Sequence, residues 1–282
     1  MNKLALGTAQ FGLDYGVTNS EGKVQVEEVE LILECAKENS INTLDTAASY
    51  GNSEEVLGSI GISDFQIITK TIPLKNGVDE VIKHFQQSLT FLNKSSVNGL
   101  LIHNINEIEH KNFNTLFKEL TELKRQGLVN KIGFSTYTPE QVDFLLKNFD
   151  FDLIQLPFNV FDTRLVEGGQ LRKLKNKAVE IHARSVFLQG LLLDFDHLVD
   201  YFSNWKNEFN VYQEIVKESG LSRLEYALHF ALNTQELDKV LVGVNNTQQL
   251  VEIINASKNN INIEAFSIND VNLLNPSNWK TG

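Results

Sequence analysis

The chain alternates between short apolar runs and longer stretches whose apolar positions recur every three or four residues. The short runs are rich in Ile, Val and Leu, which is typical of buried strands, and the longer stretches are typical of amphipathic helices. We place eight strands at residues 4–7, 41–45, 66–70, 97–103, 131–135, 152–155, 179–183 and 239–243. Because helical patterns separate them, the sequence predicts parallel strands joined by helices.

Start signals for two of these helices support the assignment. Thr138, Pro139 and Gln141 form a capping-box pattern with proline at the first helical position, and Ser222 with Glu225 forms a second. A longer segment at 191–204, before the last strand, has the character of an insertion, and long loops at a barrel mouth usually serve binding or closure.

Eight alternations in 282 residues favour an α/β fold, a (β/α)8 TIM barrel, as a single domain over residues 1–282. A doubly wound open sheet is the alternative. Its Gly-rich nucleotide fingerprint is absent, because Gly7 is followed by the sequence TAQFG, in which the glycine spacing is wrong.

Composition narrows the possible partners. The chain is 42% apolar and 22% charged, a balance typical of soluble globular proteins, and its formal charge of −11 argues against a nucleic-acid partner. The apolar run at the start of the chain is too short for a signal peptide, and no apolar run approaches the ~20 residues of a membrane span. Cys35 is the sole cysteine, so no intramolecular disulfide forms, and a reducing cytoplasm is the expected location. The sequence leaves the oligomeric state open.

Polar residues interrupt the apolar strands at their C-terminal ends. Asp45, Lys70, His103, Ser135 and Gln155 end the second to sixth predicted strands. In a parallel barrel these ends meet at one rim, so we expect the five side chains to converge there. Each residue alone has a structural explanation, such as a solvated lysine or a capping aspartate, but their occurrence on consecutive strands favours a site.

Tyr50, in the loop after Asp45, gives this set a possible chemistry. A phenol has a pKa of about 10, and a nearby ammonium from Lys70 is expected to lower it. Asp45 would then hold Lys70, and a neutral His103 would orient a carbonyl group. The scattered histidines show no metal-ligand spacing, and no nucleophile stands with a base, so no metal is expected. The set suits proton donation to a carbonyl oxygen.

Four segments carry a resemblance to a known family. LGTAQFG after the first strand, LDTAASYGNSEEVLG after the second, the pair Thr69–Lys70, and LLIH before residue 104 resemble the aldo/keto reductase superfamily, in a form typical of bacterial members. The resemblance implies a (β/α)8 barrel that binds a nicotinamide dinucleotide across its mouth. It also implies a catalytic tetrad of Asp45, Tyr50, Lys70 and His103, with Tyr50 as general acid and base.

The resemblance further implies a set of cofactor contacts. Ser135 and Gln155 would bind the carboxamide, Thr136 replaces the usual Asn, and Arg184 stands where an aromatic residue often stacks on nicotinamide. The implied cofactor-binding residues are Gly7, Thr8, Asp45, Ser135, Thr136, Gln155, Arg184, Ser185, Phe187, Gln189, Gly190, Gly243, Asn245 and Gln249.

The segment VGVNNTQQLVEII resembles the strand and helix that hold the adenosine end. Asn246 and Gln249 predict a helix start whose free N–H groups attract phosphate. NADP(H) is the family default, but residues 241–252 contain no Lys or Arg for a 2′-phosphate, so NAD(H) is also possible.

These inferences favour an NAD(P)H-dependent oxidoreductase that reduces a small-molecule carbonyl, such as an aldehyde, ketone or sugar, or runs the reverse reaction. Phe11, Tyr15, Phe158 and Phe187 are candidate pocket walls, with core packing as the alternative for each. Two other functions stay open: a nicotinamide-binding regulatory or partner-binding barrel with little turnover, and a barrel isomerase or lyase without nicotinamide.

Overall fold

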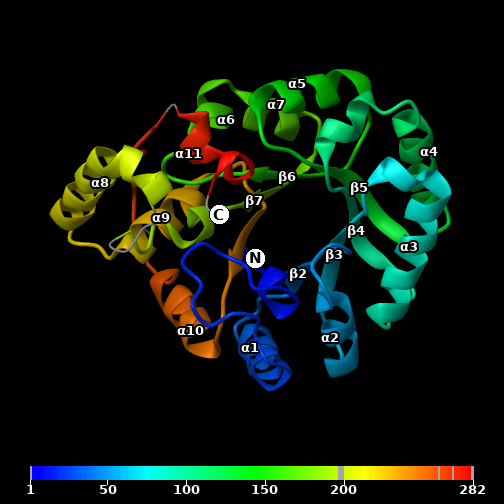
Figure 1. The fold of residues 1–282 in the computed structure, drawn as a ribbon, viewed down its shortest axis with the longest axis horizontal. Helices are drawn as coiled ribbons and strands as arrows, with labels where there is room; N and C mark the ends of the chain where they lie inside the picture. The colour runs from blue at the N-terminus through cyan, green and yellow to red at the C-terminus, as the bar shows by residue number, and fades with distance from the viewer. Residues whose placement is uncertain (1, 196–199, 260, 269, 281–282) are drawn as a thin grey trace.

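Eight parallel strands close into a barrel in the computed structural model, with helices around it (Figure 1). The structure describes residues 2–195, 200–259, 261–268 and 270–280. The strands are β1 (Leu4–Gly7), β2 (Thr43–Asp45), β3 (Gln66–Lys70), β4 (Val97–Ile102), β5 (Val129–Ser135), β6 (Leu153–Pro157), β7 (Glu180–Arg184) and β8 (Lys239–Gly243). Each strand pairs with the next along the chain, and β8 pairs with β1. The predicted (β/α)8 barrel is therefore confirmed.

All eight predicted strands form, with small shifts at their ends. β2 begins at Thr43 rather than at 41, because the N–H of Ile41 donates to the carbonyl of Ala36 (2.9 Å) and so belongs to the end of the preceding helix. β4 ends at Ile102, which makes His103 the first residue of the following loop.

Helices cover the outside of the barrel, as Figure 1 shows for α1 to α5 around the strands. They are α1 (Val26–Glu38), α2 (Ser53–Ile60), α3 (Val78–Phe91), α4 (Phe113–Arg125), α5 (Pro139–Asn148), α6 (Arg164–Glu167), α7 (Gln170–Asn176), α8 (Lys206–Ser219), α9 (Arg223–Asn233), α10 (Thr247–Ala256) and α11 (Val271–Leu274). Both predicted capping boxes form, at the starts of α5 and α9. In the described part of the chain, no helix is both long and apolar enough to cross a membrane.

The connection from β7 to β8 is the longest and carries α8 and α9. Of the predicted insertion at 191–204, residues 196–199 lie outside the described residues. The C-terminal segment packs close by: Trp205 donates from Nε1 to Asp270 (2.9 Å), and the N–H of Phe266 donates to the carbonyl of Val160 (2.9 Å).

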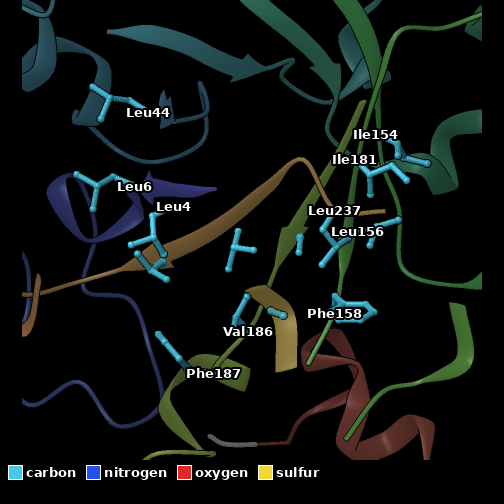
Figure 2. Packing of buried hydrophobic residues seen from close by; sticks show 14 of the residues in the cluster. Leu4, Leu6, Leu44, Ile154, Leu156, Phe158, Ile181, Val186, Phe187 and Leu237 are labelled. Atoms are coloured by element: carbon cyan, nitrogen blue, oxygen red, sulfur yellow. The ribbon is translucent and has the colours of Figure 1, made fainter. Parts of the chain in front are cut away.

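Alternation along the strands separates the core from the site. Leu44, Ile67 and Ile154 belong to the main apolar cluster between barrel and helices, part of which is shown in Figure 2. Ile68 belongs to a second, smaller cluster with Leu101 and Leu153. Because successive strand residues point to opposite faces, this smaller cluster fills the inside of the barrel.

The same alternation places the site residues on the inner face. Asp45 follows Leu44, and Gln155 follows Ile154, so both side chains point away from the main cluster. Lys70 lies two residues after Ile68 and therefore above the small inner cluster. The small inner cluster therefore lies beneath the polar residues of the rim and supports them.

Candidate active site

A cavity of about 540 Å³ opens at the C-terminal ends of the strands. Its walls include Asp45 of β2, Gln155 of β6 and Arg184 of β7, and it extends outward to Glu252 of α10. Small-molecule and cofactor sites typically enclose ~300–1,000 Å³, and barrel enzymes carry out their chemistry at this rim. The cavity is therefore the candidate active site.

Lys70 is the centre of a buried hydrogen-bonded group on this rim. Its Nζ donates to Asp45 Oδ2 (2.7 Å), to the carbonyl of Thr46 (2.8 Å) and to the Tyr50 hydroxyl (3.4 Å). Asp45 accepts a further bond at Oδ1 from Gln155 Nε2 (2.6 Å). Lys70 is 1% exposed, so all three ammonium protons have partners inside the protein. The expected convergence on Tyr50 is present.

The protonation of Tyr50 differs from the sequence-based expectation. Burial raises the pKa of the Tyr50 phenol, and the charge of Lys70 opposes this rise without reversing it. Burial alone would lower the pKa of Lys70, but Asp45 and Tyr50 outweigh it and raise the pKa overall. At neutral pH the pair is therefore a protonated phenol beside a charged ammonium. That is the resting state of a proton donor.

His103 lies beside Tyr50 as a neutral imidazole. The two ring centroids are 5.9 Å apart in an edge-on arrangement, and His103 Nδ1 is 3.1 Å from Ser49 Oγ. Burial lowers the pKa of His103 to about 3, and the charges of Lys70 and Arg184 act in the same direction. A neutral ring here offers one donor or acceptor to a polar group above Tyr50.

A contact between two glycines fixes the loop that carries Tyr50. A Cβ atom at Gly12 would lie 1.8 Å from the Tyr50 carbonyl oxygen and 2.6 Å from the Ser53 nitrogen. A Cβ atom at Gly51, which has a φ of +55°, would lie 2.2 Å from the Gly12 carbonyl oxygen. The loops after β1 and β2 therefore meet backbone to backbone, and no larger residue fits without moving Tyr50.

Gly12→Ala is expected to lower kcat about 100-fold, because a shift of roughly 1 Å in a catalytic group has an effect of this size. Steady-state kinetics on the folded variant measure it. Gly58→Ala is the matched control, since its Cβ would also lie 1.8 Å from a carbonyl oxygen, that of Phe91, but on α2 and α3 away from the cavity. An unchanged kcat in Gly12→Ala would contradict the positioning role.

Thirteen of the fourteen residues implied to contact a cofactor lie on the cavity wall. They are Gly7, Thr8, Asp45, Ser135, Gln155, Arg184, Ser185, Phe187, Gln189, Gly190, Gly243, Asn245 and Gln249. Thr136 is fully buried behind the wall, where its N–H donates to the carbonyl of Gln155 (2.8 Å). Thr136 therefore supports Gln155 from behind and does not line the cavity.

Arg184 is held by uncharged groups. Its guanidinium lies 4.2 Å from the centre of the Tyr137 ring and donates to Ser185 Oγ (3.2 Å) and to the carbonyl of Thr136 (3.0 Å). Its charge opposes the rise in the pKa of Tyr50 and helps to lower the pKa of His103. A fixed cation therefore faces the mouth of the barrel.

Two of the N–H groups at the start of α10, which were predicted to be free, donate to side chains. Asn246 Oδ1 accepts from the N–H of Gln249 (2.9 Å), as the capping pattern predicts. The N–H of Thr247, however, donates to the carboxylate of Glu28 on α1 (2.6 Å). The expectation that this helix start attracts phosphate is wrong for Thr247 and Gln249, because side chains take both donors.

Two of the predicted pocket walls lie in the core. Phe11 is fully buried, and Phe158 stacks on Phe230 of α9 with ring centroids 5.1 Å apart; neither lines the cavity. Tyr15 and Phe187 do line it. An aromatic residue just after a strand can point into the mouth or outward beneath a helix, and sequence position alone does not distinguish these directions.

The cavity also contains residues that the sequence analysis missed. Tyr137 directly follows Ser135 and Thr136 and was therefore detectable as part of the same strand end. Asn19 and Glu252 come from a long loop and from an outer helix, and no local signal marks them. In the described residues, no group of three or more His, Cys, Asp or Glu is arranged to hold a metal ion.

The cavity wall has features that fit an extended, anionic dinucleotide. A Cβ atom at Gly190 would lie 1.9 Å from Thr18 Oγ1, and one at Gly243 would lie 2.6 Å from Gln10 Nε2, so the walls approach closely where glycine stands. Ser185 and Gln189 have φ values of +58° and +56°. Loops with left-handed residues of this kind can direct successive backbone N–H groups toward an anion. Ser135 and Gln155 add polar groups at the inner end.

A half-buried phenol beside a charged lysine, at a cavity on the rim of a (β/α)8 barrel, fits an oxidoreductase acting on carbonyl or alcohol groups. The model of the aldo/keto reductase family matches residues 3–271, and the chain belongs to this family. It is 26% identical to the uncharacterized oxidoreductase YqkF of Bacillus subtilis, over 91% of each chain. It is also 26% identical to L-galactose dehydrogenase of Arabidopsis thaliana, over 77% of this chain and 73% of that one.

A solved structure has the same fold. The aldo-keto reductase AKR11C1 of Bacillus halodurans, in its holo form, superposes with a TM-score of 0.74 at 19% identity, over 91% of this chain and 87% of that one.

Proposed function

We propose that this protein is a nicotinamide-dependent oxidoreductase that reduces a small polar carbonyl compound to an alcohol, or catalyses the reverse reaction. The observation that carries the proposal is the hydroxyl of Tyr50, a residue of the cavity wall, beside the charged Lys70 buried behind it. NAD(H) or NADP(H), when bound, supplies or accepts the hydride.

In the proposed reduction, the carbonyl oxygen lies above Tyr50 and His103. Tyr50 gives its proton to that oxygen, and Lys70 stabilises the phenolate that remains. Asp45 keeps Lys70 charged and directed, and Gln155 holds Asp45 through its amide. In the oxidative direction the same phenolate takes the proton back.

The substrate is proposed to be hydroxylated. Tyr15, Tyr137 and Thr18 contribute hydroxyl groups to the wall near the mouth, and one relative is an L-galactose dehydrogenase. The expected cytoplasmic location, which rests on cysteine usage, and the single-domain extent over residues 1–282 stay predictions.

The test is cofactor oxidation in the presence of aldehydes, ketones and sugars. We expect the absorbance of the reduced cofactor to fall with at least one of these carbonyl compounds, most rapidly with a hydroxylated one. If the reduced cofactor binds but no carbonyl compound oxidises it, the protein is a binding barrel with little turnover. If it does not bind, the nicotinamide assignment is wrong.

A further inference from the structure

The outer end of the cavity, away from Tyr50, is lined by uncharged and acidic groups. Asn19, Asn245, Gln249 and Glu252 form this end. Arg184 is the only Lys or Arg on the cavity wall within the described residues, and it stands at the barrel mouth beside Tyr50. A negative group at the outer end would therefore find no cation there.

Three backbone N–H groups at this end already donate to side chains. Glu28 accepts from the N–H of Thr247 (2.6 Å), and Asn246 accepts from the N–H of Gln249 (2.9 Å). The N–H of Asn245 donates to Gln249 Oε1 (2.8 Å). Side chains of the protein therefore take two of the N–H groups at the start of α10, where an anion could otherwise bind, and one of these side chains is a carboxylate.

Three carboxylates give this region a negative charge: Glu252 is on the cavity wall, and Glu28 and Glu21 lie against the start of α10. Besides Glu28, Glu252 accepts from Gln248 Nε2 (2.9 Å), and Glu21 lies 3.4 Å from Asn246 Nδ2. Lys23, from the same loop as Glu21, directs its Nζ elsewhere, to Asn52 Oδ1 (3.4 Å).

We propose that this outer end accepts an adenosine ribose with a free 2′-hydroxyl and rejects a 2′-phosphate, so that the protein uses NAD(H) in preference to NADP(H). Glu28 and Glu252 are the specificity-determining residues. The inference rests on the proposed function, because a hydride donor placed at Tyr50 leaves this end for adenosine. A phosphate adds a charge of about −1.5 to −2, which the carboxylates repel, whereas a hydroxyl donates to a carboxylate.

Binding measurements by calorimetry test this without turnover. We expect NADH to bind the wild-type protein on the order of tenfold or more tightly than NADPH. ADP-ribose and its 2′-phosphate, which lack the nicotinamide ring, should show the same ratio, because the discrimination lies at the outer end. Raising the salt concentration should narrow the ratio, since salt screens repulsion between exposed charges.

Charge-removing variants assign the effect to residues. Glu28→Gln with Glu252→Gln keeps side-chain oxygens for Thr247 and Gln248, so NADPH affinity should rise about tenfold while NADH affinity changes little. Glu252→Lys should favour NADPH further. The charge-matched control is Glu214→Gln with Glu218→Gln, two exposed positions on α8 outside the cavity, which should leave the ratio unchanged.

Equal or tighter binding of NADPH by the wild-type protein, with carbonyl reduction intact, would overturn this inference and leave the proposed function standing. An unchanged ratio in the Glu28 and Glu252 variants would also overturn the assignment to these residues. Failure of both cofactors to bind would overturn the proposed function together with the inference.

Discussion

Tyr50→Phe is expected to lower the rate of carbonyl reduction about 1,000-fold, within the ~100- to 10,000-fold that a general acid contributes. The variant removes only the hydroxyl that lies 3.4 Å from Lys70 Nζ. Because the ring stays in place against His103, the cavity keeps its shape, and cofactor affinity should stay within about threefold of wild type. Single-turnover kinetics and a separate binding titration measure the two effects.

Tyr15→Phe is the control for this experiment. Tyr15 also lines the cavity, but the three groups that Lys70 Nζ contacts are Asp45, Thr46 and Tyr50. Loss of the Tyr15 hydroxyl should therefore change KM more than kcat. A Tyr50→Phe variant that reduces the best substrate at the wild-type rate would show that another group donates the proton.

Lys70→Met is expected to abolish measurable turnover and to reduce stability. Without the ammonium, only the weaker effect of Arg184 opposes the burial that raises the pKa of Tyr50, so the phenolate left after proton transfer loses its main stabilising charge. The variant also leaves the Asp45 carboxylate, 3% exposed, without its cation, and breaking a buried pair in this way typically costs about 3–5 kcal/mol. Denaturant unfolding and steady-state kinetics measure the two losses.

A double variant separates these losses. Lys70→Met with Asp45→Asn removes the uncompensated charge, so part of the stability should return while turnover stays absent. If turnover returned together with stability, Lys70 would be a structural residue and not a partner of Tyr50.

Strand positions were predictable because each strand is a compact apolar run, and in several of them a polar residue at or near the C-terminal end marks the rim. Asp45, Lys70, Ser135 and Gln155 were found in this way, since the C-terminal ends of parallel strands must converge. His103 lies just beyond its strand and still faces the same space. His103 could therefore be identified from its place directly after an apolar run, even though the predicted end of that strand was one residue too late.

Features that depend on three-dimensional surroundings were not predictable. The pKa of Tyr50 depends on how much water its ring loses, which no local pattern reports, so Lys70 was assigned a larger influence than it has. Phe158 was predicted to line the pocket, but it stacks in the core on Phe230, which is distant in the sequence. Glu28 could not be connected with Thr247 because 219 positions separate them in the sequence.

The contact between Gly12 and Gly51 has a consequence for redesign of the protein. It anchors one end of the loop after β1 directly beneath Tyr50, through main-chain atoms alone. Further along the same loop, Asp14, Tyr15 and Ser20 are exposed, and Tyr15 reaches the cavity. Substitutions at these outer positions should therefore change substrate preference, while the contact between Gly12 and Gly51 keeps Tyr50 in place.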